Sequence, residues 1–387
     1  MSTNSEELLP VYARVAREIQ RQLSGMEVGD RLPAERQLCT SLGVSRVTLR
    51  RAMEPLHREG FLNTRRGGGT WLVREVQAPV PMDGVSQQII GLVVPTVENP
   101  LISRIVQGAE SFAAESGFHI AVAHDHGDPD YQIKQLRRMV ESGLGGIAVY
   151  PDTCNLQSAE FRNLIQEIDK QSIPLVMIDR YIPDMEVCSV LSDNFAGMYT
   201  ATQHMIAAGC RRLALLAFGA DAGVPDRERR KGFIMAMQDY GLKRMPAYEA
   251  DIGVSGHEET AHKAVAKWLK DASGEGCPFD GIVTMQDNMA YGAYVALREA
   301  GLEVPKDVSL VGYDNLDREL FSVSGLHLSS IDQPAEEIGR EAARQLISRL
   351  RGAASQTRAL HTLLKPRLVV RSSCGQGVAQ AAPGGTL

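Results

Sequence analysis

The strongest constraint on the fold is a repeated alternation of short apolar runs with helical stretches over residues 89–372. The apolar runs are IIGLVV (89–94), HIAVA (119–123), GIAVY (146–150), PLVMI (174–178), RLALLAF (212–218), GIVTM (281–285) and VSLVG (308–312). Because these runs are apolar throughout, we expect each strand to be covered by helices on both faces. The alternation predicts a parallel α/β architecture, and this length suffices for two lobes.

Glycine ends many of the helical stretches between these runs. The left-handed backbone at a helix end is easiest for glycine, which has no Cβ, and the chain turns back toward the sheet at that point. The glycines in this position are Gly117, Gly143, Gly209, Gly241 and Gly301. The sequence therefore predicts a helix stop with positive φ at each of them.

Residues 1–75 follow a different pattern, which indicates helices and then a hairpin. A first amphipathic helix has apolar residues at helical spacing, and they are Val11, Val15, Ile19 and Leu23. We expect a short second helix to start at Pro33, because helix starts tolerate proline, and to end at Gly43. Ser45 is the expected N-cap of a third helix. The apolar positions of that helix are Leu49, Met53 and Leu56.

Two short β-runs follow the third helix. FLNTR (61–65) and TWLV (70–73) are separated by Arg66 and three glycines, which favours a hairpin. A short helix, a tight turn, another helix and a hairpin together indicate a winged helix–turn–helix. In such a motif the second of the two helices lies in the major groove of DNA, with its N-terminal residues against the base edges.

Charge divides the chain at the same place. The whole protein has 41 Lys plus Arg and 47 Asp plus Glu, a formal net charge of −6. Residues 1–75 hold 12 Arg, no Lys and 9 acidic residues, a net charge of +3, and the remaining 312 residues hold 29 basic and 38 acidic residues, a net charge of −9. Only the first part therefore has the charge that suits phosphate. Residues 76–88 contain Pro79 and Pro81 without a helical or strand period, and we expect a linker there.

Arginine and hydroxyl side chains at the start of the third helix are the candidates for DNA contacts. Arginine can bridge O6 and N7 of guanine, and hydroxyls can hold phosphates or base edges. The candidates are Ser45, Arg46, Thr48 and Arg50 on this helix, Arg36 on the helix before it, and Arg66 and Gly67 at the hairpin tip. The segment 8–74 resembles the winged helix of the GntR family of bacterial regulators. In that family the residues that touch operator DNA match Arg36, Arg46, Arg50, Arg66 and Gly67.

One residue departs from a regular third helix. Pro55 removes a backbone hydrogen bond, and its ring is expected to clash with the carbonyl of Arg51. We expect a kink between the DNA-facing half of the helix, 46–53, and the half that packs on the core. The motif itself is expected to survive, because the base-facing residues all precede the proline.

Polar residues follow the carboxyl ends of the apolar runs, where ligands bind in open parallel sheets. They are Asp125, Asp179, Arg180, Asp287 and Asp314, with Arg229 at the start of the helical stretch RRKGFIMAM. Carboxylates accept paired hydrogen bonds from neighbouring hydroxyls, so their convergence favours a polyhydroxylated ligand. Each Asp by itself also suits a helix N-cap or a turn, and only their shared position at strand ends supports a site.

Long stretches of this region resemble the effector domain of the lactose/galactose-repressor family. They are VPTVENPLISRIVQGAE, IDRYIPDMEVCSVLSDNFAGMYTATQHMIAAGCRRLALLAF, RRKGFIMAM, MQDNMAYGAYVALREAGLEVPKDVSLVGYDN and IDQPAEEIGREAARQL. The resemblance spans 89–372 and implies a two-lobed fold of the periplasmic-binding-protein type. The residues that match the family's sugar cleft are Asp179, Arg229, Asp287 and Asp314. Gln286 stands where the family usually has Asn, and the family's own helix–turn–helix and hinge helix are absent.

Catalytic and metal-binding functions find less support. His257 and His262 in HEETAH are five residues apart, so on a helix they point about 140° apart and cannot share a zinc ion as an H-E-x-x-H pair does. A metal at His124 and His126 is the alternative to ligand binding in that loop. The sequence contains neither a glycine-rich phosphate loop nor a nucleophile elbow. We therefore expect no catalysis, no metal and no cofactor.

We expect a cytoplasmic protein, because the sequence shows no recognisable targeting feature. No run approaches the ~18 apolar residues of a membrane span, and the first 20 residues lack the basic start and apolar core of a secretory signal. The six cysteines are scattered without a C-x-x-C pair, as expected for free thiols in a reducing compartment. A solute-binding protein of a transporter would share the fold but needs export.

The two parts together predict a ligand-responsive bacterial transcription regulator, a repressor that binds double-stranded operator DNA as a homodimer and senses a small sugar. The expected divisions are a DNA-binding domain at 1–75, a linker at 76–88, a two-lobed effector domain at 89–373 and a disordered tail at 374–387. Two alternatives stay open: a purine or sugar phosphate as effector, and an activator or a regulator that needs a co-repressor. Extra cationic groups around Arg229 and Arg180 would indicate a phosphorylated effector.

Overall fold

The protein is described here by a computed structural model. It describes residues 15–16, 18–19, 22–23, 26, 28–58, 61–65, 69–73, 88–219, 223–253, 256–272, 276–316, 325, 327–351 and 361–375. Several sequence predictions fall outside these residues. They are the first helical position at Val11, the wing residues Arg66 and Gly67, the linker from 76 to 87 and the tail from 376 onward.

The N-terminal part contains the predicted helices around one apolar core. The helices are α2 (Glu35–Leu42) and α3 (Arg46–Arg58), and Val15, Ile19 and Leu23 lie in an earlier helical segment. These three side chains pack with apolar residues of α2 and α3, among them Leu38, Leu49 and Leu56. The amphipathic spacing along the sequence is thus explained by a shared core.

The predicted helix stop and the predicted N-cap are both present in the turn between α2 and α3. Gly43 ends α2 with a left-handed backbone, φ +65° and ψ +30°. The hydroxyl of Ser45 accepts a hydrogen bond from the backbone N–H of Thr48 at 3.2 Å, as an N-cap does. The predicted start of α2 is off by two residues, because Ala34 is the N-cap and Pro33 precedes it. Helix α3 runs unbroken across position 55, and the kink at Pro55 stays a prediction.

The predicted wing is an antiparallel pair of strands, β1 (Leu62–Arg65) and β2 (Gly69–Leu72). Its register pairs Leu62 with Leu72, and both side chains are buried in the core under α3. The wing is also tied to the preceding segment, since the N–H of Leu32 donates to the carbonyl of Thr70 at 2.8 Å. These contacts hold the hairpin against the helices.

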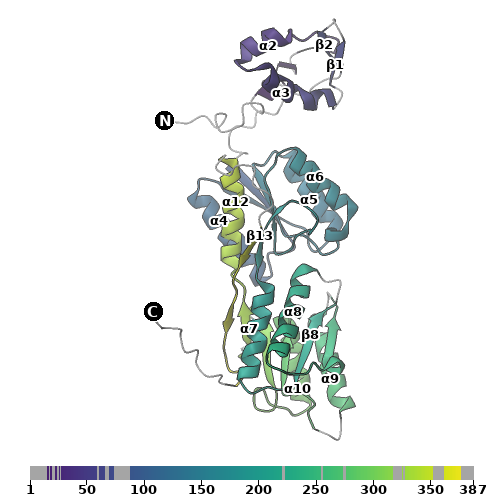
Figure 1. The fold of residues 1–387 in the computed structure, drawn as a ribbon, viewed down its shortest axis with the longest axis vertical. Coiled ribbons are helices and arrows are strands. Elements are labelled where there is room, and N and C mark those ends of the chain that lie inside the picture. Colours follow the sequence, from purple (N-terminus) through teal and green to yellow (C-terminus); the bar gives the residue numbers. More distant parts are fainter. Residues whose placement is uncertain are drawn as a thin grey trace.

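The first lobe is a six-stranded parallel sheet in the order β13-β7-β6-β5-β3-β4. Its strands are β3 (Ile89–Val94), β4 (His119–His124), β5 (Gly146–Val149), β6 (Leu175–Ile178), β7 (Cys188–Ser192) and β13 (His361–Leu364). Its helices are α4 (Pro100–Glu115), α5 (Pro129–Glu141), α6 (Ala159–Lys170) and α12 (Ala335–Leu350), with a 3-10 turn η3 (Asn155–Gln157). Helices α4 and α12 cover one face, and α5 and α6 cover the other (Figure 1).

The second lobe has a sheet in the order β14-β12-β11-β10-β8-β9, in which only the pairing of β12 with β14 is antiparallel. Its strands are β8 (Leu213–Phe218), β9 (Glu249–Ile252), β10 (Gly281–Thr284), β11 (Ser309–Tyr313), β12 (Ser329–Asp332) and β14 (Arg367–Val369). Its helices are α7 (Asn194–Ala207), α8 (Val224–Asp239), α9 (His257–Asp271) and α10 (Asp287–Glu299), with a 3-10 turn η4 (Pro246–Tyr248). The first five strands of each lobe follow the same order, so the two lobes repeat one topology.

The parallel α/β prediction is confirmed, and all seven apolar runs are strands. All five predicted glycine stops have positive φ, from +65° at Gly143 to +104° at Gly209. The expectation that each run is covered on both faces is wrong for β4, which is an edge strand with Val122 41% exposed. Polar strands escaped prediction, as the sequence Ser329–Asp332 of β12 illustrates.

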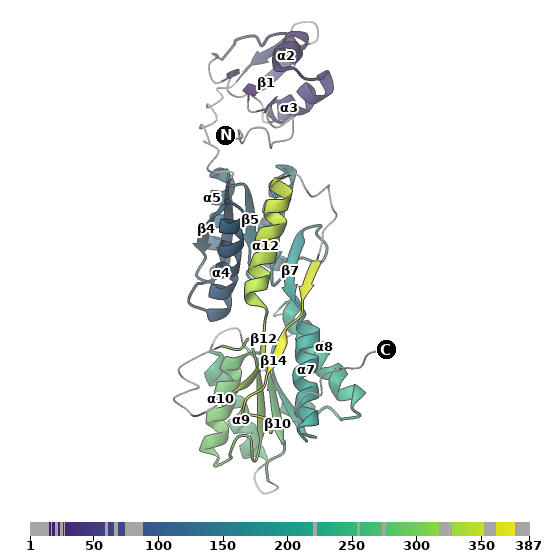
Figure 2. The same cartoon turned by 90° about the vertical axis from the view of Figure 1, so that its left-hand side faces the viewer.

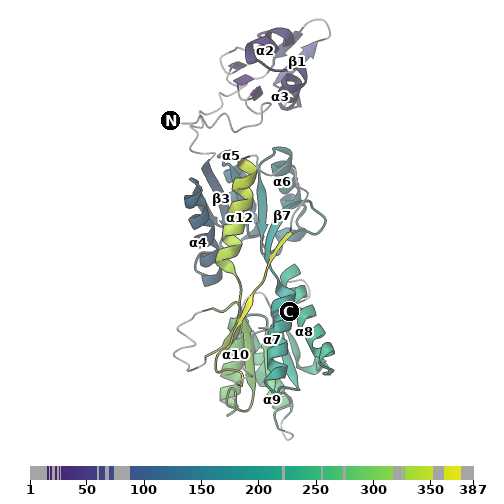
Figure 3. The ribbon, with the colours of Figure 1, turned by 60° about the vertical axis from the view of Figure 1, so that its left-hand side comes forward.

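The chain passes between the lobes three times. The crossings join β7 to α7, β12 to α12 and β13 to β14. Figure 2 shows the long helix α12 returning to the first lobe beside α4, and Figure 3 shows the yellow segment with β13 and β14 running from one lobe to the other. A close contact fixes the first of these arrangements, because a Cβ on Gly339 of α12 would lie 1.9 Å from the carbonyl oxygen of Ile105 in α4.

None of the helices in the described part of the chain combines the length and the apolar character that crossing a bilayer requires.

Candidate functional site

The first turn of α3 presents an exposed basic face. Arg46 is exposed, Val47 is 77% exposed, and Arg36 on α2 is exposed as well. The opposite side of α3 is buried through Leu49 and Met53. Apolar spacing therefore turns the arginines outward, as a helix that enters the major groove requires.

Arg50 on this face is held by an acidic partner that sequence reasoning missed. Its guanidinium donates to both carboxylate oxygens of Glu35, Nε to Oε1 at 3.1 Å and Nη2 to Oε2 at 3.2 Å. The hydrogen bond from Arg50 lowers the pKa of Glu35. The pair joins α2 to α3 and points the guanidinium of Arg50 along the outer face, where phosphate or a base edge would compete with Glu35.

The hydroxyls of Ser45 and Thr48, which were predicted to contact DNA, form hydrogen bonds at the N-terminus of α3. Ser45 caps α3, and its Oγ lies 2.9 Å from Oγ1 of Thr48. Both residues lie where they were expected, but a contact with DNA would have to share these hydrogen bonds.

A second group of charged side chains lies between the two lobes. We call it the inter-lobe cluster, and its members are Asp179, Arg180, Asn194, Asp226, Arg229, Asp314 and Gln333. Asp179 and Arg180 follow β6 of the first lobe, Asn194 begins α7 at the first crossing, and the others belong to the second lobe or the second crossing. The cluster is therefore built at the carboxyl ends of strands from both sheets, beside the crossings.

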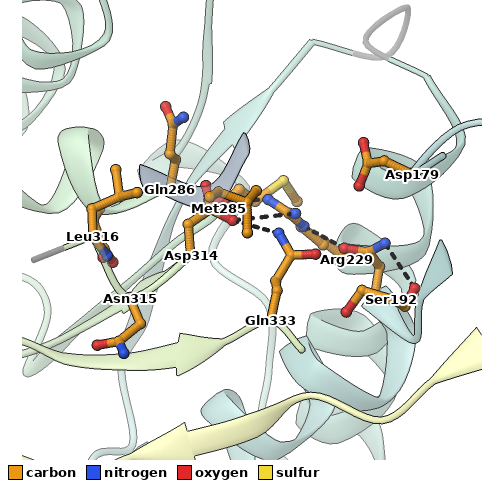
Figure 4. Close-up of polar contacts among 12 residues, drawn as sticks. Asp179, Ser192, Arg229, Met285, Gln286, Asp314, Asn315, Leu316 and Gln333 are labelled. Carbon is orange, nitrogen blue, oxygen red and sulfur yellow. Dashed lines mark hydrogen bonds and ion pairs between the residues drawn. The ribbon is translucent and has the colours of Figure 1, made fainter. Parts of the chain in front are cut away.

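Arg229 is the centre of this cluster (Figure 4). It is 5% exposed, and its Nε donates to Oδ1 of Asn194 at 2.8 Å while its Nη1 donates to the carbonyl of Met285 at 2.6 Å. Its Nη2 lies 3.5 Å from Oδ1 of Asp314, and its guanidinium carbon lies 3.8 Å from the ring centroid of Tyr313. Burial alone would lower the pKa of Arg229, but the carboxylate of Asp314 and the other acidic groups raise it above its ordinary value. The side chain is a fixed cation.

Asp314 occupies a strained turn directly after β11, with φ +93°. Its Oδ1 accepts a hydrogen bond from Nε2 of Gln333 at 2.7 Å, and burial raises its pKa. Gln333 follows β12, so the two side chains meet at neighbouring strand ends. An uncommon backbone conformation of this kind is kept where the surrounding structure has a use for the side-chain direction it gives.

Asp179 and Arg180 form the first-lobe side of the cluster. The hydroxyl of Tyr150 donates to Oδ2 of Asp179 at 2.6 Å, and Nε of Arg180 lies 3.6 Å from the same oxygen. Nη1 of Arg180 also donates to the carbonyl of Pro151 at 3.1 Å. Each arginine of the cluster thus faces a carboxylate of its own lobe.

Asp287 lies beside the cluster but its carboxylate is used internally. Its Oδ1 accepts from the hydroxyl of Ser330 and its Oδ2 accepts from the N–H of Leu316, both at 2.7 Å. Burial raises the pKa of Asp287 to about 8. These bonds anchor the loop that carries Asp314, so the structure assigns Asp287 a supporting position, and its predicted contact with an effector stays a prediction.

Asp125 is not brought into the cluster. It lies after the edge strand β4, is fully buried, and accepts hydrogen bonds from the N–H of Gly127 at 2.9 Å and from Nε2 of Gln132. Burial raises its pKa. Its contacts are those of a turn former, which is the alternative that the sequence left open for each aspartate.

Many polar atoms of this region lack partners. Among the described residues, eight buried side-chain nitrogen or oxygen atoms have no hydrogen bond, and five of them belong to the cluster or adjoin it. The five are Oε1 of Gln286, Oε1 of Gln333, the hydroxyl oxygens of Ser192 and Tyr313, which face each other, and Nε of Arg180, whose nearest carboxylate oxygen, on Asp179, is 3.6 Å away. Buried polar atoms are normally paired, so this concentration indicates a place where another molecule supplies the bonds.

Sequence reasoning missed Asp226 and Gln333. Asp226 precedes Arg229 by three residues on α8 and therefore shares its helix face, which was a usable signal. Gln333 follows a strand whose sequence is too polar to be recognised, so its position at a strand end was hidden. Within the described ranges, no three His, Cys, Asp or Glu side chains are placed to hold a metal ion.

Comparisons with known proteins agree with both parts of the structure. Residues 11–72 match the model of bacterial regulatory proteins of the gntR family, and residues 202–374 match a periplasmic binding protein-like domain. The arabinose metabolism transcriptional repressor of Geobacillus stearothermophilus is 28% identical over 370 residues, which cover 95% of this chain and 98% of that protein. This alignment therefore spans both of the regions of this chain that match family models.

The second part of the chain has further relatives. The transcriptional repressor PurR of Aliivibrio fischeri is 30% identical over 288 residues, 73% of this chain and 80% of that protein. The crystal structure of a regulatory protein of the LacI family from Chloroflexus aggregans superposes with a TM-score of 0.63 at 27% identity and covers 75% of this chain and 99% of that one. About three quarters of this chain is thus similar to each of these two transcription regulators.

Proposed function

Because this chain belongs to the GntR/LacI-type family of ligand-responsive bacterial transcription regulators, we propose that it is a repressor that binds operator DNA as a homodimer and releases it when a neutral sugar binds the inter-lobe cluster. The chain is a regulator and not an enzyme. The observation that carries the sugar proposal is the set of unpaired buried polar atoms contributed by both lobes.

The charges of the cluster support a neutral polyhydroxylated effector over a phosphorylated one. Arg229 faces Asp314 at 3.5 Å and Arg180 faces Asp179 at 3.6 Å, so each guanidinium is already balanced. The nearby Arg230 is bound to Glu249 and Asp251 outside the cluster. The extra cations that a phosphate needs are thus not among the described residues that contact Arg180 or Arg229. Hydroxyls, in contrast, can donate to the carboxylates and to the free amide oxygens.

The three crossings support a mechanism in which binding changes the angle between the lobes. A sugar that bonds to Asp179 in the first lobe and to Arg229 and Asp314 in the second would favour one relative orientation. It shifts the equilibrium only to the extent that it binds that orientation more tightly. The changed lobe angle would move the two DNA-binding domains of a dimer, which read a palindromic site with half-sites one helical turn, or a multiple of a turn, apart.

The experiment combines a thermal-shift screen with operator binding. A panel of neutral pentoses, hexoses and disaccharides that includes L-arabinose is tested first, since a ligand that binds only the folded protein raises its Tm. L-Arabinose is included because a relative over 95% of the chain is an arabinose metabolism repressor. A sugar that raises the Tm should also weaken binding to an operator duplex selected from a random library. The proposal is wrong if saturating sugar across the panel leaves operator affinity and lobe geometry, measured by small-angle scattering, unchanged.

A further inference from the structure

Asp226 is a buried carboxylate in the first turn of α8. The proposed sugar contacts with Asp179, Arg229 and Asp314 do not involve it. It is 8% exposed, and no hydrogen bond or ion pair joins its carboxylate to another residue in the described part of the chain. Helix α8 follows β8, so its first turn lies at the carboxyl edge of the second sheet. One turn later on the same face, Arg229 reaches into the inter-lobe cluster.

The charged groups that face Asp226 come from both lobes. They are Arg229 on its own helix, Asp314 after β11, and Asp179 and Arg180 after β6 of the first lobe. The two arginines are already matched by the two other aspartates, Arg229 by Asp314 and Arg180 by Asp179. Asp226 is therefore the surplus carboxylate of the cluster. Burial raises its pKa to about 6, which still leaves it mostly ionised at neutral pH.

A purely structural role explains this arrangement poorly. An acidic residue in the first turn of a helix stabilises the helix through its dipole by about 0.3–1 kcal/mol when exposed and by up to about 2 kcal/mol when partly buried. A carboxylate on a residue that is only 8% exposed loses most of its hydration, and without a hydrogen bond from a described residue this desolvation costs more free energy than the helix dipole returns, a cost that is retained where function needs the group. The strand ends, the crossings and the unpaired atoms around it place Asp226 where an effector would supply the missing donors.

We propose that Asp226 is a specificity-determining residue of the effector site, which accepts hydrogen bonds from neighbouring hydroxyls of a neutral sugar and excludes anionic effectors. This inference rests on the proposed function, because it assigns a role within the same site. Two neighbouring hydroxyls match the two oxygens of one carboxylate, whereas a phosphate would bring a like charge next to Asp226 and Asp314.

The test compares the full-length protein with Asp226→Asn and with a matched control, Glu228→Gln. Glu228 lies on the same helix, and its carboxylate is paired with Lys231 on the exposed side. The probes are L-arabinose, D-ribose and D-galactose, with D-ribose 5-phosphate as the anionic probe. Asp226→Asn should weaken binding of the sugar that stabilises the wild type by about 10- to 100-fold, the usual loss for a hydrogen bond to a charged group. It should also increase the response to D-ribose 5-phosphate, and Glu228→Gln should change neither.

A ligand-free measurement separates this role from a structural one. At pH 7.5 the Tm of Asp226→Asn should equal or exceed that of the wild type, because the variant removes an unpaired buried charge. A structural carboxylate predicts the opposite, a lower Tm. Sugar affinity of the wild type should also fall between pH 7.5 and pH 5, as Asp226 takes up a proton, and Asp226→Asn should show a smaller fall that reflects Asp314.

The possible results distinguish a failure of the role proposed for Asp226 from a failure of the proposed sugar-sensing function. Unchanged sugar affinity in Asp226→Asn, or a Tm well below that of the wild type, overturns the role of Asp226 while leaving the sugar sensor intact. A wild type that responds to D-ribose 5-phosphate and to none of the three sugars overturns both. If no probe raises the Tm of the wild type, the proposed sugar function fails for these sugars, and the ligand-free Tm still decides whether Asp226 is a structural residue.

Discussion

The arginines of the DNA-binding domain and those of the inter-lobe cluster differ in their access to water. The side chains of Arg50 and its partner Glu35 are 69% and 42% exposed, whereas those of Arg229 and Asp314 are each 7% exposed. An exposed ion pair contributes little to stability and exchanges easily for another anion, but a buried charge depends on its partner. The first arrangement leaves arginine available to phosphate, and the second fixes the geometry of a binding site.

Removal of the buried guanidinium of Arg229 should destabilise the protein more than any other change considered below. Arg229→Ala leaves Asp314 without its counter-charge and removes the bonds to Asn194 and Met285, so the free energy of unfolding should fall by about 3–5 kcal/mol. Urea unfolding followed by circular dichroism measures this. Arg344→Ala is the control, because the 55% exposed side chain of Arg344 pairs with Glu341 on the same helix, and its loss should cost less than about 1 kcal/mol. If both variants lost the same free energy of unfolding, the buried ion pair of Arg229 would be no more important for stability than an exposed one.

The next effect concerns the exposed side of α3. Arg46→Ala should abolish detectable operator binding by the dimer, because each half-site loses about 1–3 kcal/mol of base or phosphate contact. Fluorescence anisotropy with the selected operator duplex gives the operator affinity. Sugar affinity and Tm should stay at the wild-type values, since the Arg46 side chain is exposed and has no hydrogen bond or ion pair with a described residue of the effector domain. A parallel loss of operator and sugar binding would indicate misfolding instead of a lost contact.

A pH effect distinguishes the buried carboxylates from the exposed ones. The pKa of Asp287 is about 8 in the folded protein, above the value of roughly 4 in an unfolded chain, so the folded state holds one more proton between these values. The contribution of this group to stability should therefore fall as pH rises from 4 to 8, by on the order of 1 kcal/mol per pH unit. Asp287→Asn should remove that part of the slope in urea unfolding across pH 5–8. A slope identical to that of the wild type would show that Asp287 is ionised in the folded state.

The smallest effect is the response to salt. Operator affinity should fall between 50 and 200 mM salt with a slope that reflects a few phosphate contacts, since the arginines of α2 and α3 are exposed. Sugar affinity should change by less than about twofold over the same range, because the inter-lobe cluster is buried from mobile ions. Titrations at four salt concentrations test both. Equal salt dependence would mean that ions reach the effector site as freely as they reach the DNA-binding surface.

Local sequence patterns predicted the structure correctly wherever the type of one residue, or the period of a short run, sets the backbone conformation. The glycine stops, the Ser45 cap, the wing strands and all seven apolar strands follow from such patterns, and the structure confirms them. Strands buried on both faces are readable because they are apolar throughout. Strand β12 is not readable in this way, because the side chains of Ser329, Ser330 and Asp332 form hydrogen bonds with other side chains and so can be buried; Gln333, which follows this strand, was missed for the same reason.

The roles of the individual aspartates could not be derived in the same way. Four of the predicted aspartates follow strands but differ in their contacts. Asp125 and Asp287 accept hydrogen bonds from nearby turns and loops, whereas Asp179 and Asp314 belong to the inter-lobe cluster. Which role each takes depends on the direction that the local backbone gives the side chain and on what the neighbouring strand places opposite. Neither is encoded in spacing along the chain.

The two-part organisation of this protein follows from its sequence, because helical and strand periods, glycine stops and the division of charge are local properties. Which charges are paired depends instead on the fold, since groups far apart in sequence meet at the lobe crossings. Arg229 and Asp314 are 85 positions apart and face each other, whereas Asp226, three positions from Arg229, has no hydrogen bond or ion pair to any described residue. The surplus carboxylate that we assign to effector selection is visible only after the fold has matched the others.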